Sequence, residues 1–230
     1  MNELIASSAT VGVVISLLAY QIGVFIKKKT KNAFFNPLLI AIILVIAFLL
    51  VFHIDYETYN NSAKYLSYLL TPATVSLAIP LYQKLDLLKK NFGAILLGIL
   101  SGVLTSLVSI LGMAILFQLS HEEYVTLLPK SITTAIGIGV SEELGGYVSI
   151  TAASIILTGI LGNITAEFLC KWFRIKNPVS RGLAIGTSSH AIGTAKAMEM
   201  GQIEGAMSSL AIVVAGLLTV VSASIFAMFY

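Results

Sequence analysis

The segment from Phe92 to Leu119 contains no charged side chain, and several other segments of the chain are nearly as apolar. A helix of about 20 apolar residues spans the hydrocarbon core of a bilayer. Only 11% of the residues are charged and 57% are hydrophobic, whereas about a quarter are charged in soluble domains. This composition excludes the soluble-enzyme, collagen, disordered and disulfide-scaffold classes and predicts an integral membrane protein.

Basic residues fall into three short clusters, and these predict the topology. The clusters are Lys27–Lys31, Lys84–Lys90 and Lys171–Arg181, while acidic residues occupy the connections between them. By the positive-inside rule the basic loops are cytoplasmic and the N-terminus is outside. We therefore expect a single all-α membrane domain over residues 1–230 with about six full spans. These spans are Leu4–Ile26, Pro37–Phe52, Ala63–Tyr82, Phe92–Leu119, Tyr147–Cys170 and Ala206–Tyr230.

Two further segments, Leu127–Val140 and Gly182–Met200, are too short or too polar for ordinary spans. We interpret the first as a re-entrant helix that enters from outside, with Glu142 and Glu143 near its turn in a wet cavity. The alternative is one full crossing, which would place Lys171–Arg181 outside. If the second segment enters from the cytoplasm, the two resemble the broken helices of transporters with inverted repeats.

A weak internal similarity supports a repeated unit. Residues 72–79 (PATVSLAI) align with residues 129–136 (PKSITTAI), and Pro72 and Pro80 interrupt the third expected span. In a chain this rich in Ala and Ile, chance agreement explains the similarity equally well.

The first candidate site follows Pro129, which suits the first turn of a helix. Backbone amides there, with the hydroxyls of Ser131, Thr133 and Thr134, would form an anion pocket at a positive helix end. Lys130 is a candidate charge partner for the anion. Alternatively, the hydroxyls only pack helices together, and Lys130 extends to the outer surface.

The second candidate site is the segment GTSSHAIGTAK, residues 186–196, because polar groups at membrane depth usually line a pathway. Its candidate substrate-binding residues are Thr187, Ser188, Ser189, His190 and Thr194, with Lys196 as a second charge partner and Asn163 from the preceding span. His190 could exchange a proton with the carried anion. Alternatively, backbone carbonyls satisfy His190, and Asn163 bonds the broken helix rather than a substrate.

No enzyme class is indicated. A Ser–His pair would have to come from different segments, for example His190 with Ser131 or Ser141, and no third acid is evident to orient it. The chain has no Cys/His metal spacing and no nucleotide-binding motif, so we expect no metal and no cofactor. Glu167 and Lys171, four residues apart, are expected to form an interfacial ion pair.

Several runs closely resemble the LrgB/CidB family of bacterial membrane proteins, also called antiholin-like or YohK-like. The runs are FNPLL, LLTPATVSLAIPLY, LLPKSITTAI, LGGYVSITA and RIKNPVSRGLAIGTSSHAIGTAKAMEMGQIEGAMSSLA. The resemblance covers essentially the whole chain. Ala135 stands where many members have Pro, which implies a softer kink. Glu142 and Glu143 fall where members vary, which argues against a coupling role for them.

The resemblance implies two functions. Members were first described beside small LrgA/CidA-type holin-like proteins, as modulators of murein hydrolase activity and cell lysis. Relatives include a two-subunit bacterial pyruvate uptake system, and a plastid glycolate/glycerate transporter resembles the two subunits fused. We expect a plasma-membrane transporter subunit for small monocarboxylates that works with an LrgA/CidA-like partner. A homo-oligomer is compatible with this interpretation, and we expect no binding to nucleic acid. The alternative is an antiholin-like regulator of murein hydrolase activity and cytolysis.

Overall fold

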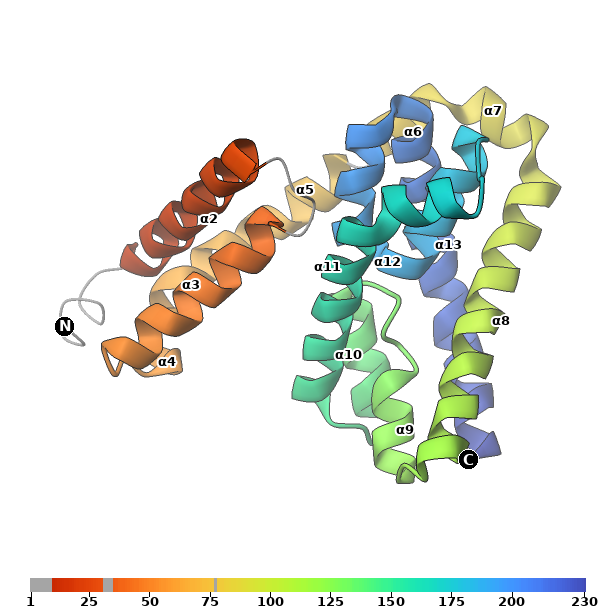
Figure 1. The fold of residues 1–230 in the computed structure, drawn as a ribbon. Coiled ribbons are helices and arrows are strands. Elements are labelled where there is room, and N and C mark those ends of the chain that lie inside the picture. The colour runs from red at the N-terminus through yellow and green to blue at the C-terminus, as the bar shows by residue number, and fades with distance from the viewer. Residues whose placement is uncertain (1–9, 31–34, 77) are drawn as a thin grey trace. The chain divides into compact units, whose positions relative to one another are not determined.

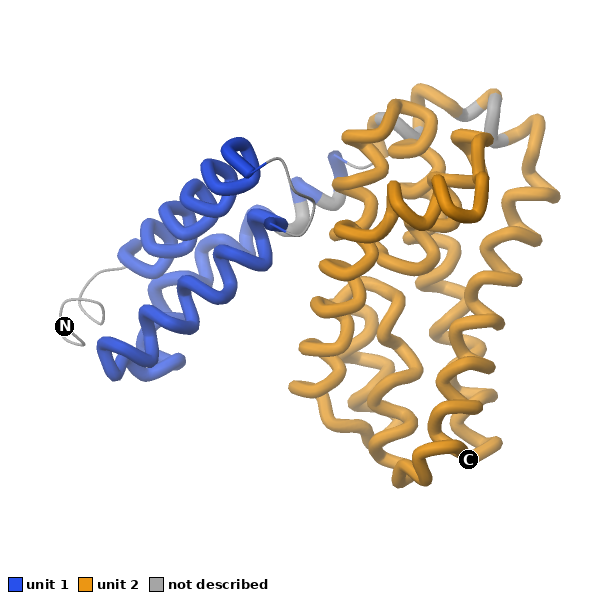
Figure 2. Tube along the Cα trace, in the orientation of Figure 1, with its two compact units in different colours: residues 1–76 blue, residues 77–230 orange. Residues whose placement is uncertain are grey.

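A computed structural model describes residues 10–30, 35–76 and 78–230 of the chain. Within these ranges every regular element is a helix, as the sequence predicts (Figure 1). The chain divides into two compact units, residues 1–76 and residues 77–230 (Figure 2). Each unit is described by itself below.

Unit 1 consists of apolar helices joined by well-capped turns. Its elements are α2 (Val11–Thr30), α3 (Pro37–Val51), α4 (Tyr56–Ala63), η1 (Lys64–Leu69) and α5 (Leu70–Ser76). The Asn36 side chain caps α3 by accepting hydrogen bonds from the amides of Leu38 and Leu39 at 2.8 and 3.3 Å. Gly12 donates its amide to Ser62 Oγ at 3.0 Å, which joins α2 to α4.

The expected span Ala63–Tyr82 is not one continuous helix. It is divided among η1, α5 and α6 (Ala78–Gln83), and the boundary between the two units lies within it. Pro72 and Pro80 each remove a backbone N–H from the hydrogen-bond ladder, which explains why a long helix does not form here. This finding agrees with the prediction that the third span is interrupted.

Unit 2 contains three long helices. Its elements are α6, α7 (Leu85–Lys90), α8 (Phe92–Phe117), α9 (His121–Leu127), α10 (Thr134–Glu143), α11 (Val148–Trp172), α12 (Pro178–Met200), α13 (Gln202–Phe226) and η2 (Ala227–Phe229). Helices α8 and α13 run in the same direction and α11 runs opposite to both (Figure 1). One face of α8 packs on α9 and α13, and the facing residues of α13 are mostly Ala and Gly, so the helices approach closely.

Helices α9 and α10 form the first of two helical hairpins. The hairpin starts where α8 ends, and its connecting residues Leu128–Thr133 lie beside the middle of α8. The Thr151 hydroxyl of α11 donates to the Thr126 carbonyl at 2.9 Å and accepts from the Ser141 hydroxyl, whose Oγ lies 2.6 Å away. These bonds join α9, α10 and α11, and the re-entrant interpretation of this segment agrees with the fold-back.

Two details of that interpretation are wrong. The helix begins at Thr134 rather than at Pro129, because the residues after α9 form two tight turns instead. Glu142 and Glu143 lie exposed at the far end of α10, so they are not near the turn of the hairpin. An exposed position at the open end of a hairpin removes the need for a wet cavity around them.

Helix α12 is the second hairpin, and it reverses direction at His190 (φ 42°, ψ −141°). A side chain at Gly193 would meet Ile185, eight residues earlier, which is impossible in a straight helix. Both arms lie against the first half of α13. A side chain at Gly186 in the first arm would collide with the Ser208 carbonyl, and Thr194 in the second arm bonds Ser208 Oγ at 2.7 Å.

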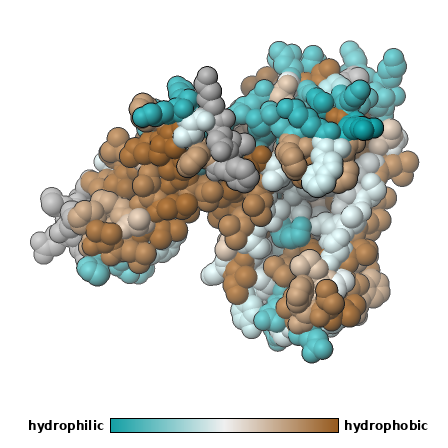
Figure 3. Space-filling model, viewed as in Figure 1, coloured by the Kyte–Doolittle hydropathy of each residue, from teal (hydrophilic) through white to brown (hydrophobic). Residues whose placement is uncertain are grey.

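Four of the described helices are long and apolar enough to cross a membrane: Val11–Thr30, Phe92–Phe117, Val148–Trp172 and Gln202–Phe229. Helix α3 is equally apolar but shorter. The predicted spans match α3, α8, α11 and α13 closely, whereas residues 4–9 of the first one lie outside the described residues. The flank of unit 2 is largely apolar and its hydrophilic residues gather toward its ends (Figure 3).

The suggested sequence repeat is not confirmed. Residues 72–76 are helical, whereas residues 129–133 are the irregular connection between α9 and α10. The two hairpins nevertheless begin at opposite ends of unit 2, because α9 follows the end of α8 and α12 follows the end of the antiparallel α11.

Candidate anion-binding pocket

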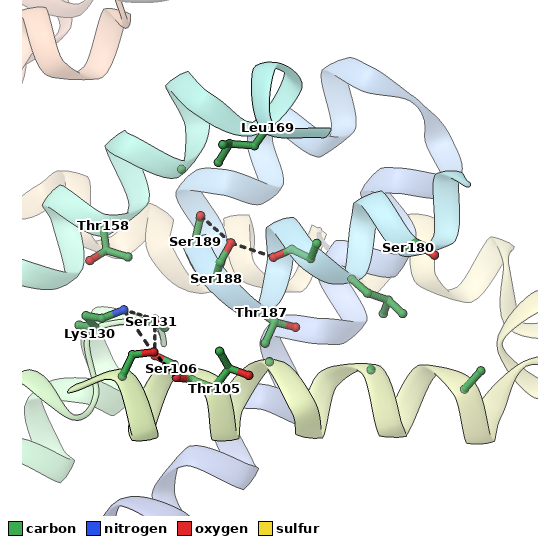
Figure 4. Close-up of a pocket in the computed structure, with 17 residues that line it drawn as sticks. Thr105, Ser106, Lys130, Ser131, Thr158, Leu169, Ser180, Thr187, Ser188 and Ser189 are labelled. Atoms are coloured by element: carbon green, nitrogen blue, oxygen red, sulfur yellow. Dashed lines mark hydrogen bonds between the residues drawn. The ribbon is translucent and has the colours of Figure 1, made fainter. Parts of the chain in front are cut away.

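A pocket of 670 Å³ lies in unit 2 between α8 and α11, bounded by parts of both hairpins (Figure 4). Its polar lining is almost entirely hydroxyl groups. They belong to Thr105, Ser106 and Ser109 of α8, Ser131 of the α9–α10 connection, Thr158 of α11, and Ser180, Thr187, Ser188 and Ser189 of α12. Among the described lining residues there is one charged group, Lys130, and no carboxylate.

Lys130 is held in the pocket by the tight turns after α9. Its amide donates to the Leu127 carbonyl at 3.1 Å and the Ile132 amide donates to the Pro129 carbonyl at 3.2 Å. Its Nζ donates to Ser131 Oγ at 3.0 Å and to Ser106 Oγ at 3.4 Å. Lys130 therefore points inward and does not extend to the outer surface.

The ammonium group of Lys130 has no acidic partner in the described part of the chain within salt-bridge distance. Hydroxyl oxygens solvate an ammonium group, but they do not neutralise its charge. A half-buried, uncompensated cation surrounded by hydroxyl donors is suited to bind a small anion.

Thr187 supplies a second unusual polar group. Its side chain is 7% exposed, and its Oγ1 has no hydrogen-bond partner among the described residues. Buried hydroxyls in native proteins almost always have a partner. Gly102 of α8 brings Thr187 close, because a side chain at that glycine would collide with Thr187 Cγ2. Thr187 lines the pocket, but its Oγ1 is shielded from solvent, so a ligand would bond this hydroxyl after the threonine side chain has rotated.

Ser188 and Ser189 are already hydrogen-bonded. Ser188 Oγ donates to the Ala184 carbonyl at 2.8 Å, and the two serine hydroxyls lie 3.0 Å apart. They face the pocket across from Lys130 and Ser131 (Figure 4). The pocket thus brings together predicted residues from both candidate segments: Lys130, Ser131, Thr187, Ser188 and Ser189.

His190 is buried at the tip of the α12 hairpin and does not line the pocket. Its Nε2 lies 2.9 Å from the carbonyl oxygen of Ile155 in α11. Gly159 permits this contact, since a side chain there would collide with the imidazole ring. The structure agrees with the interpretation in which a backbone carbonyl satisfies the histidine.

The other predicted residues lie elsewhere. Thr194 bonds the His190 carbonyl at 2.9 Å and Asn163 Nδ2 donates to the Ile192 carbonyl at 2.9 Å, so both hold the α12 hairpin. Lys196 pairs with Glu167 at 3.0 Å and with Glu199 at 3.3 Å. Its charge is therefore compensated within the protein, and Glu167 pairs with Lys196 rather than with Lys171.

Thr133 and Thr134 do not line the pocket either. Thr133 precedes the first residue of α10 and its side chain makes no capping hydrogen bond. The predicted anion site at a helix start after Pro129 is thus replaced by a site at the ammonium group of Lys130. Because the helix begins later, its first amides lie away from Ser131.

Sequence reasoning missed the contribution of α8. Gly98, Gly102 and Ser106 line the pocket at intervals of four residues, and Thr105 and Ser109 do the same on the adjacent face. A span without charges that carries hydroxyls at this spacing presents one polar stripe. That pattern was visible in the sequence, but Gly98 and Gly102 alone indicate only close helix packing.

Long apolar helices, two helical hairpins and a pocket whose polar groups are mostly hydroxyls define an integral membrane protein of the all-helical class. The chain belongs to the LrgB-like family, which matches residues 16–229. It is 41% identical to the antiholin-like protein LrgB of Bacillus subtilis (strain 168), over 94% of each chain. It is 41% identical to that of Bacillus mycoides (strain KBAB4), over 91% of this chain and 92% of the relative. No solved structure matches the chain.

Proposed function

We propose that this protein is a membrane transporter subunit for small monocarboxylates of the pyruvate or glycolate type, located in the bacterial plasma membrane. One observation supports it above all others: the Lys130 ammonium lies among hydroxyls in a pocket without a carboxylate. The proposal includes a small LrgA/CidA-like partner subunit, as the family resemblance implies.

The energetics favour a bound anion. Removing an ion from water costs several kcal/mol unless an opposite charge compensates it, and cations within membrane proteins usually face functional cavities. A carboxylate beside Lys130 would supply the missing charge and accept hydrogen bonds from Ser106 and Ser131. A purely structural role would be served as well by an uncharged residue.

The size of the site favours a short ligand. Lys130 contacts Ser106 and Thr187 contacts Gly102, and these two α8 residues are four positions apart. That spacing is about 6 Å along a helix. A two- or three-carbon acid with its carboxylate at Lys130 would extend its hydroxyl or keto oxygen to Thr187, and rotation of the threonine side chain would turn Oγ1 toward it. This pairing would satisfy both unusual groups of the pocket with one molecule.

The arrangement of the hairpins also supports transport. Two hairpins that begin at opposite ends and reach the middle of the protein are typical of secondary transporters. An oligomeric pore would require apolar packing surfaces, but it would not require an unpaired cation at this depth.

The test is pyruvate binding and flux in proteoliposomes that contain the full chain with its proposed partner. Replacing Lys130 by Gln removes the charge and keeps a hydrogen-bond donor. Loss of a hydrogen bond to a charged group costs about 1.5–3 kcal/mol, so affinity should fall roughly 10- to 100-fold. Lys130→Arg should retain most of the affinity. Lys176→Gln is the matched control, because Lys176 is exposed and lies outside the pocket. Equal affinity in Lys130→Gln and Lys176→Gln would overturn the proposal.

The names of the relatives favour a second function. Curated relatives are called antiholin-like, which supports a role as a regulator of murein hydrolase activity and lysis. In a deletion strain that expresses Lys130→Gln, a regulator independent of transport should restore normal autolysis although pyruvate flux is lost. If the same variant loses both, regulation depends on the carried anion.

A further inference from the structure

Two smaller cavities lie between the central pocket and one end of unit 2. The first has a volume of 100 Å³ and shares Gly162, Leu169, Ala184, Ser188 and Ser189 with the central pocket. The second has a volume of 280 Å³ and shares Cys170 with the first. The three cavities thus follow one another along α11 and α12, and neighbouring cavities share lining residues.

We infer that this series is the route by which a small anion passes between the central pocket and the end of unit 2 that carries Lys171 and Arg181. The inference rests on the proposed transport function. The cavity of 100 Å³ is the smallest of the series, and Cys170 lines both it and the terminal cavity.

The walls of the route suit an anion that must remain solvated. Ser188 and Ser189 present hydroxyls where the central and middle cavities meet. A side chain at Gly162 would overlap that of Ser189, so this glycine keeps α11 close to the hairpin at the junction. Hydroxyl groups at such a point replace water around a passing carboxylate.

The terminal cavity carries both signs of charge, and its two carboxylates share one cation. Glu167 and Glu199 line it, but both pair with Lys196. Arg181 pairs with Glu204 at 3.8 Å and its Nε donates to the Ile175 carbonyl at 2.7 Å. The three carboxylates at this end, Glu204 included, are outnumbered once Lys171 and the nearby Arg174 are added to Lys196 and Arg181, which makes the end attractive to anions.

The test uses Cys170, the single cysteine of the chain. The anionic reagent sulfonatoethyl methanethiosulfonate forms a mixed disulfide with a thiolate and releases methanesulfinate, which adds a charged plug at that position. The full chain is treated in detergent, the extent of modification is measured by mass spectrometry, and the protein is reconstituted with its proposed partner. Binding and flux of radiolabelled pyruvate are then compared with those of untreated protein.

The expected result is that modification of Cys170 abolishes most of the flux and leaves pyruvate binding unchanged, because Cys170 does not line the central pocket. Cys170→Ser should be insensitive to the reagent. Cys170→Ser with Lys176→Cys should react without loss of flux, since Lys176 lies at the same end outside the cavities.

Two outcomes would overturn the route. One is full flux after complete modification of Cys170, and the other is a Cys170 that reacts only when the protein is unfolded. Failure of the proposed function can be distinguished from failure of the route. If the protein is not a transporter, untreated protein shows neither pyruvate binding nor flux. The reactivity of Cys170 would in that case still show whether water reaches this position.

Discussion

The two hairpins of unit 2 look alike in sequence and differ in how their polar groups are satisfied. Both are rich in Gly, Ser and Thr and both return at mid-depth. The α12 hairpin bonds most of its buried polar groups to neighbouring helices, with His190 on the Ile155 carbonyl and Thr194 on Ser208, and leaves Thr187 Oγ1 without a partner among the described residues. The α9–α10 hairpin presents Lys130 to a pocket, where hydroxyls alone surround it. Polarity at membrane depth therefore indicates function only where the protein leaves it uncompensated.

The largest expected effect on stability comes from a comparison of how closely the two hairpins are packed. A side chain at Gly186 in α12 would meet the Ser208 carbonyl and Ala211, whereas Gly139 in α10 has open space around its Cβ position. Overpacking costs about 1–3 kcal/mol, so Gly186→Ala should lower the melting temperature of the detergent-solubilised protein. Gly139→Ala should leave it unchanged or raise it, since Ala stabilises a helix by roughly 1 kcal/mol relative to Gly. Equal melting temperatures would show that the α12 arm is not closely packed.

The next prediction concerns a variant that should change ligand affinity without lowering stability. Thr187→Val removes a buried hydroxyl that has no hydrogen-bond partner among the described residues, so the free energy of unfolding should not fall. A ligand that bonds this hydroxyl would lose about 0.5–1.5 kcal/mol, or roughly 2- to 10-fold in affinity. Thr165→Val is the matched control, because the Thr165 hydroxyl bonds within its own helix at 2.7 Å and lies outside the central pocket. The measurements are thermal unfolding and pyruvate affinity. Unchanged affinity in Thr187→Val would exclude the hydroxyl from the site.

Apolar periodicity and charge placement predicted most of the fold. The expected ends of α3, α8, α11 and α13 fall close to the observed ones, because each is set by the border between apolar and polar residues. The hairpins were foreseen from Gly and polar residues, but their turning points were not. Pro129 is compatible both with a helix start and with a tight turn, and only the packing against α8 selects the turn.

The candidate site was only partly predictable, because the sequence does not show which partner each polar residue will have. Serines and threonines in a membrane protein bond either their own backbone or a ligand, and the residue type is identical in both cases. Lys130 and Lys196 were equal candidates in the sequence. Glu199 lies three residues after Lys196, so the sequence spacing already pairs these two, but only the fold adds Glu167 and leaves Lys130 among hydroxyls.

The smallest expected effect concerns His190, where the structural and proton-coupling hypotheses disagree. Because Nε2 lies 2.9 Å from the Ile155 carbonyl, Gln at this position can still donate one hydrogen bond, although it cannot take up a proton. If the histidine serves only to hold the hairpin tip against α11, His190→Gln should accumulate pyruvate under a pH gradient almost as well as the wild type. His190→Leu is the comparison variant, because it removes the donor from a buried carbonyl contact and should cost about 1 kcal/mol of stability. Accumulation is measured in proteoliposomes at matched protein content. Loss of gradient-driven accumulation in His190→Gln, with pyruvate binding retained, would show instead that the tip of α12 carries the proton and that both hairpins contribute directly to transport.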